Sequence, residues 1–314
     1  MPETGKPAGK QRNADRVFQW MTALCAGIVL LLMAGFFVRL LLSSRLSLAH
    51  FGWRFLISNE WNPYRGEFGA LSSLYGTLVS TAIAMIIAVP LSLAIALFLV
   101  EMAGPRVRRI VGSAIELLAA IPSIIFGMWG LFIFAPFAAK YLQPALGKSL
   151  GFLPLFKGPP MGVGILTAGF ILALMILPFI SAVMRDVFQM VPAVVKESAY
   201  GMGATTWEVT RKITVRYGIR GLVGACFLGL GRAVGETMAV TFVIGNRHDV
   251  SASLFAAGNS IASTLANEFT EASEPLYLSS LVELGLILFI LSLALQVMAH
   301  YWLRSLSRSM GAGL

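Results

Sequence analysis

The sequence predicts an all-α membrane protein that crosses the bilayer six times. Of its 314 residues, 57% are hydrophobic and only 12% are charged, whereas about 25% of the residues of a typical soluble domain are charged. The mean hydropathy is +0.79. A membrane-spanning helix needs about 20 apolar residues, and six stretches reach that length. They are residues 17–42, 74–100, 110–138, 161–184, 219–244 and 279–303.

The first four stretches each have a feature that bears on their assignment. Residues 17–42 follow four basic residues, as in a signal peptide, but the apolar run is too long and no small-residue cleavage pattern ends it. We therefore expect a retained first helix. Pro90, Pro122 and Pro178 lie within stretches two, three and four. Membrane helices tolerate proline where neighbouring groups satisfy the freed carbonyls, so we expect these three helices to be continuous.

The distribution of basic residues predicts the orientation. Fifteen Lys and Arg residues lie in the two terminal tails and in residues 101–109 and 185–220, and seven lie in the loops of the opposite side. Because cytoplasmic loops carry the excess of Lys and Arg, we expect both termini to be cytoplasmic, with residues 44–73, 140–160 and 245–278 outside. The excess of Lys and Arg on the cytoplasmic side of a protein embedded in membrane lipid then explains the net charge of +9. No nucleic-acid partner is therefore expected.

A polar segment between the fourth and fifth stretches carries the most specific pattern. Glu197, Ser198 and Ala199 are followed after three residues by Gly203 and after a further nine by Ile213. An acidic residue, small residues and a glycine in this order favour a helix, a turn and a second helix. The pattern resembles the coupling loop of ABC importer permeases, which runs Glu-Ala-Ala, three residues, Gly, nine residues, Ile.

This resemblance implies the type I ABC importer (MetI-like) permease fold. One departure is that Val215 and Arg216 stand where the family has Leu and Pro. In that family two permease subunits enclose the path, two cytoplasmic ATPases hold the coupling helices, and an extracytoplasmic binding protein delivers the substrate. We accordingly expect a basic tail at 1–16, a first helix and outer loop at 17–73, a permease core at 74–303 with the coupling loop at 185–220, and a tail at 304–314.

Two ionisable residues, Arg232 and Glu236, lie within the fifth stretch. A central Arg costs about 2.5–3.5 kcal/mol on insertion scales, so intramembrane charges are candidates for function. We expect their i,i+4 spacing to stack them on one helix face, where they partly neutralise each other. Gly231 and Gly235 would let another helix approach closely. The pair is a structural ion pair, an anion-attracting part of a translocation path, or both.

The residues around Arg232 and Glu236 indicate which type of ABC importer permease the chain resembles. Residues 231–241, with residues 120–127 and 259–269, look like the PstC-type permease of phosphate-specific importers, and the resemblance extends from about residue 70 to 303. It implies phosphate import across a bacterial inner membrane by a heterodimer with a second related permease, an ATPase dimer and a phosphate-binding protein. Another oxyanion (sulfate, molybdate or phosphonate) is an alternative substrate. A secondary transporter is a further alternative, although it needs no coupling loop and often has paired broken helices.

No enzyme, cofactor or metal site is expected. Residues 147–149 end like a phosphate-binding loop, but Leu142 stands where that pattern needs glycine. The three histidines lack ligand spacing, and no nucleophile motif is present. Cys25 and Cys226 are too few for a disulfide framework. We therefore expect a translocation subunit, with ATP hydrolysed by a separate subunit.

Overall fold

A computed structural model describes residues 9–311, and the side chains of residues 15–305. Six helical segments in this part of the chain are long and apolar enough to cross a membrane, which confirms the all-α, six-span prediction. These segments are Asp15–Ser43, Leu71–Met102, Ser123–Leu150, Ile165–Gln189, Thr206–Val234 and Pro275–Ser305.

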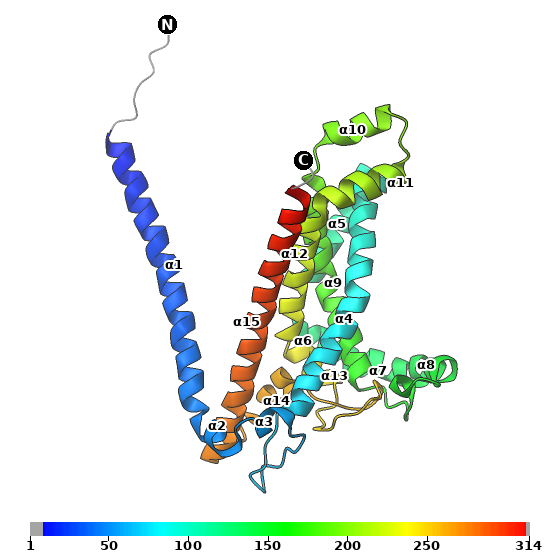
Figure 1. Cartoon of the computed structure of the whole chain (residues 1–314). Coiled ribbons are helices and arrows are strands. Elements are labelled where there is room, and N and C mark those ends of the chain that lie inside the picture. Colours follow the sequence, from blue (N-terminus) through cyan, green and yellow to red (C-terminus); the bar gives the residue numbers. More distant parts are fainter. Residues whose placement is uncertain (1–8, 312–314) are drawn as a thin grey trace.

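The bundle is built from α-helices with a few π-helical turns (Figure 1). The α-helices are α1 (Gly9–Ser43), α2 (Arg45–Phe51), α3 (Arg54–Ile57), α4 (Leu71–Leu97), α5 (Pro105–Ala119), α6 (Ser123–Trp129), α7 (Ala135–Phe137), α8 (Gln143–Leu150), α9 (Ile165–Gln189), α10 (Ala193–Gly201), α11 (Thr206–Val209), α12 (Val215–Val234), α13 (Met238–Val243), α14 (Ile261–Glu268) and α15 (Pro275–Gly311). The π-helical turns are η1 (Phe98–Met102), η2 (Gly130–Phe134), η3 (Ala138–Leu142) and η5 (Thr210–Thr214), and η4 (Pro154–Phe156) is a 3-10 turn.

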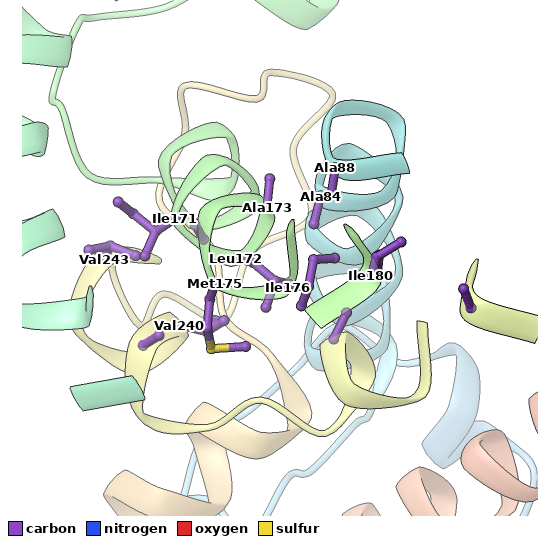
Figure 2. Packing of buried hydrophobic residues seen from close by; sticks show 14 of the residues in the cluster. Ala84, Ala88, Ile171, Leu172, Ala173, Met175, Ile176, Ile180, Val240 and Val243 are labelled. Carbon is purple, nitrogen blue, oxygen red and sulfur yellow. The ribbon is translucent and has the colours of Figure 1, made fainter. Parts of the chain in front are cut away.

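Helix α9 forms the centre of the bundle. Its large side chains, including Ile176 and Ile180, are fully buried, and α4 presents the small side chains of Ala84 and Ala88 to them (Figure 2). Small residues let two helix backbones approach closely in a membrane, which explains why α4 and α9 pack along most of their length. Helices α12 and α13 cover the other sides of α9.

Helix α1 stands apart from this bundle. Figure 1 shows it leaning away and meeting the other helices only near α2. There the hydroxyl groups join α2 to α15, since the Ser47 backbone N donates to Ser279 Oγ at 3.1 Å and Ser280 Oγ lies 3.1 Å from Ser47 Oγ. Between α1 and α15 lies an apolar cleft of about 730 Å³, lined by residues such as Met33, Phe36, Leu281, Phe289 and Leu293.

Two of the predicted spans are interrupted. Residues 110–138 do not form one helix, because α5 ends at Ala119 and α6 begins after Pro122, whose ψ of 138° is extended. Residues before a proline are disfavoured in helical conformation, and here that preference prevails. Residues 219–244 are interrupted as well: α12 ends at Val234 and α13 begins at Met238. The helix ends at Gly235, where a residue without a β-carbon weakens the helix.

Candidate functional site

The break after α12 separates the two ionisable residues of the fifth span. Arg232 lies in the last turn of α12 with an exposed side chain, and its guanidinium carbon is 5.7 Å from the centroid of the Phe179 ring in α9. Glu236 lies beyond the helix end and is half-buried. Among the ion pairs of residues 15–305, none joins Arg232 to Glu236. The expectation that both stack on one helix face is therefore wrong.

Glu236 instead caps the next helix. Its Oε1 accepts a hydrogen bond of 3.2 Å from the backbone N of Ala239, in the first turn of α13. The first N–H groups of a helix lack partners within the helix, and a carboxylate is favoured there by the helix dipole. The Glu236 carboxylate thus holds the broken backbone in place, and the charge of Arg232 is left to interact with an aromatic face.

The two interrupted spans meet beside this break. Gly127 of α6 lies so close to α13 that an added Cβ would be 2.8 Å from a ring carbon of Phe242 and 3.0 Å from the Cα of Ala239. Only a residue without a side chain permits this approach. Helices α6 and α13 are consequently held against each other, next to the end of α12 (Figure 1).

The polar segment has the helix-turn-helix form that its sequence indicates. α10 contains Glu197, Ser198 and Ala199; the first two are exposed, and Ala199 is buried. Gly203 has φ of +87°, a conformation that L-residues with a side chain rarely adopt. A reciprocal pair of hydrogen bonds between Thr205 and Glu208 then caps α11.

Ile213 lies further along, half-buried in η5. Ile213 is therefore less exposed than Glu197 and Ser198.

Large apolar side chains on this segment are exposed at the end of the bundle. Met202 is 83% exposed and Trp207 is 68% exposed. We call the exposed apolar residues Met190, Val194, Tyr200, Met202 and Trp207 the coupling surface. The sequence pattern identified the loop but not these residues, although an apolar residue in a polar loop was a visible signal.

A second cluster, at the opposite end of the bundle, ties two loops to α14 and α15. The carboxylate of Glu268 accepts hydrogen bonds from Trp61 Nε1 at 2.6 Å and Tyr277 Oη at 2.7 Å. Its other oxygen lies 2.8 Å from His248 Nε2, and the His248 ring stacks on Trp61 with 5.1 Å between centroids. Burial raises the pKa of the Glu268 carboxyl, but these hydrogen bonds outweigh burial, and the net pKa lies below its ordinary value.

Comparison with known proteins agrees with this architecture. Residues 88–310 match the family described as "Binding-protein-dependent transport system inner membrane component". The chain is 51% identical to the "Phosphate transport system permease protein PstC" of Mesorhizobium japonicum, over 95% of this chain and 92% of that protein. It is 54% identical to the protein of the same name from Pasteurella multocida, over 88% of each chain.

Solved structures support the fold. A bacterial ABC transporter involved in the import of the acidic polysaccharide alginate superposes with a TM-score of 0.60 at 13% identity, over 95% of this chain and 99% of that one. A chain of the MetNI methionine ABC transporter in an inward-facing conformation superposes with a TM-score of 0.52 at 18% identity, over 77% and 95%. The chain therefore belongs to the binding-protein-dependent transport system inner membrane components, and among them to the family of PstC permease proteins.

Proposed function

We propose that this chain is the permease subunit of an ATP-driven importer that carries inorganic phosphate inward across the bacterial cytoplasmic membrane by alternating access. The observation that carries the substrate assignment is the 51% identity, along nearly the whole chain, to a phosphate transport system permease protein. Permease subunits are translocation components, so ATP is hydrolysed by another subunit. Alternating access then requires a structure that nucleotide biases at one end and the loaded binding protein at the other.

The coupling surface supports docking of a cytoplasmic ATPase. Exposed Glu197 and Ser198 and the turn at Gly203 place α10 at the end of the bundle, with Met202 and Trp207 outermost. In the same segment, Ala199 is buried and Ile213 is half-buried. We propose two ATPase subunits, one for each permease of a heterodimer with a second, related permease, and a phosphate-binding protein on the outer side.

Arg232 is the residue that we propose for attracting the anion in the path. Its guanidinium is exposed and forms no ion pair with Glu236, so in this conformation its positive charge is available to a phosphate. A guanidinium holds phosphate in a bidentate fork, which a lysine ammonium cannot reproduce. Glu236 contributes indirectly, by capping α13 and so fixing the backbone next to Arg232.

The test is phosphate uptake into proteoliposomes that contain the complete importer. Arg232→Gln should abolish most uptake while the ATPase still co-purifies, and Arg232→Lys should keep partial activity. Glu236→Gln should be milder than Glu236→Ala, because an amide oxygen still accepts from Ala239 N. If a double variant with apolar residues at positions 232 and 236 takes up phosphate normally, Arg232 has no part in the path. Uptake of sulfate or molybdate in place of phosphate would contradict the substrate assignment.

A further inference from the structure

We propose that Glu101 is a positioning residue that transmits movement of the coupling helix α10 to the membrane bundle, through an ion pair with Lys196 and a hydrogen bond from Thr214. The proposal rests on the proposed function, because it needs an ATPase that acts on α10. We call these three residues the cytoplasmic clamp.

The clamp joins three elements at one oxygen atom. Lys196 Nζ of α10 lies 2.6 Å from Glu101 Oε1 of η1, and Thr214 Oγ1 of η5 donates to the same oxygen at 2.8 Å. The side chains of Glu101 and Lys196 are only 6% and 17% exposed, and Thr214 is fully buried. Water therefore screens this ion pair little.

The clamp connects α10 to the second membrane span through side-chain contacts. α10 packs against α11 and η5, the segments that follow it in the chain. Lys196 reaches across 95 residues of sequence to η1, which continues α4, and α4 packs along α9 in the core. A displacement of α10 is therefore passed directly to the two most extensively packed helices of the bundle.

The receiving end of the clamp is itself fixed. Arg108 of α5 donates from Nε to the Leu99 carbonyl oxygen at 2.8 Å and from Nη2 to the Val100 carbonyl oxygen at 2.7 Å. These bonds hold the backbone just before Glu101. The bonds from Arg108 thus fix the position of Glu101 relative to α4 and α5. The carboxylate that Lys196 contacts therefore moves only together with these two helices.

Both bundle residues of the clamp lie on π-helical turns. Glu101 belongs to η1 and Thr214 to η5. A π turn holds an extra residue, and one residue corresponds to about 100° of rotation in an α-helix, so each turn redirects its side chains. Turns of this kind occur frequently at functional sites. Here they bring Thr214 to the same oxygen of Glu101 that Lys196 contacts.

A buried ion pair suits a mechanical link. Separating Lys196 from Glu101 would leave both charges without a partner in a poorly hydrated site, which is strongly unfavourable. α10 therefore cannot move away from α4 at low cost, and the two move together. A pair that only stabilised the fold would have no effect on the amount of phosphate carried per ATP.

The experiment uses the complete importer in proteoliposomes and measures ATPase retention, ATP hydrolysis, phosphate uptake and melting temperature. The variants are Glu101→Gln, Lys196→Met, the exchange Glu101→Lys with Lys196→Glu, and the control Lys212→Met. Lys212 pairs with Glu208 within one helix, with both side chains largely exposed. Each single variant should retain the ATPase and hydrolyse ATP within about twofold of wild type, while phosphate carried per ATP falls about tenfold or more. The exchange should recover most of this ratio, and Lys212→Met should keep it.

Three results would overturn the clamp. One is an unchanged ratio of phosphate to ATP in both single variants. Another is loss of uptake only in proportion to lost folded complex, with a lowered melting temperature and a constant ratio, which indicates a structural pair. The third is an equal fall in Lys212→Met, which indicates a general effect of charge. Failure of the proposed function differs from all three, because the wild-type complex would then bind no ATPase or carry no phosphate.

Discussion

Replacing Glu268 by Gln should loosen the loops that meet at this residue without unfolding the bundle. The carboxylate receives hydrogen bonds from Trp61 and Tyr277 on one oxygen and contacts His248 with the other, at 2.6, 2.7 and 2.8 Å. These partners come from the loop before α4, from α15 and from the loop before α14. The Gln side chain has the same shape, so the change removes charge and leaves packing intact.

The size of the effect follows from the hydrogen bonds. A bond to a charged group contributes about 1.5–3 kcal/mol and a neutral one about 0.5–1.5 kcal/mol, so the two bonds that the amide oxygen still accepts from Trp61 and Tyr277 each lose about 1 kcal/mol. The amide NH2 group cannot accept, so the contact with His248 is weakened by a similar amount. The Glu268 side chain is 17% exposed, which leaves little screening by water. A total of about 2–3 kcal/mol raises the opening equilibrium about 30- to 140-fold, since 1.4 kcal/mol is a factor of ten.

Hydrogen–deuterium exchange of the protein in nanodiscs measures this opening. Peptides from α14 (Ile261–Glu268) should exchange about 30- to 140-fold faster in Glu268→Gln, whereas peptides from α9 should be unchanged, because exchange reports local opening separately for each region. Glu271→Gln is the matched control, since Glu271 lies three residues further on and is exposed. Exchange of α14 within about threefold of wild type would refute the reasoning.

Three other predictions concern the turn at Gly203, the effect of low pH on the stabilisation by Glu268, and the membrane topology. Gly203→Ala should impair phosphate uptake or ATPase retention and Gly201→Ala should not, because both sites have open space but only Gly203 has a positive φ; equal behaviour of the two would contradict this. Because the pKa of Glu268 is lowered from 4.5, its contribution is complete above about pH 4.5 and is lost as pH falls through the lower folded value. The difference in melting temperature between wild type and Glu268→Gln should therefore vanish on acidification, and a constant difference would refute the assignment. An impermeant thiol reagent applied outside should label a cysteine at position 150 and not one at position 200, with the reverse pattern overturning the proposed orientation.

Some of the architecture was predictable because the signals are local. The length of an apolar run is sufficient to predict a spanning helix, and the ends of four spans agree with the structure within a few residues. The glycine after α10 is likewise a local signal, since a turn with positive φ favours glycine. For this reason the pattern from Glu197 to Gly203 gave the correct helix and turn.

The helix breaks were not predictable from local rules. Pro90, Pro122 and Pro178 have similar apolar surroundings in the sequence, yet α4 and α9 continue through the first and third while the chain breaks at the second. Pro90 is exposed and Pro178 is buried, but they lie in α4 and α9, which pack along each other, whereas Pro122 is exposed outside that helix pair. Packing with distant residues decides the outcome, and a single sequence does not record it. The cluster around Glu268 joins residues far apart in the chain and escaped prediction for the same reason.

The helix breaks at Pro122 and Gly235 indicate which face of the chain a partner would cover. Backbone that is not helical is tolerated at membrane depth only where protein buries it or water reaches it, yet residues 120–122 and 235–237 are partly or fully exposed in this single chain. In the importer that we propose, these segments would therefore face a second subunit or an aqueous path. Broken helices are also typical of secondary transporters, and the breaks alone do not separate the two classes. The coupling surface favours the importer that we propose, because a transporter that works without an ATPase needs no docking surface such as exposed Met202 and Trp207.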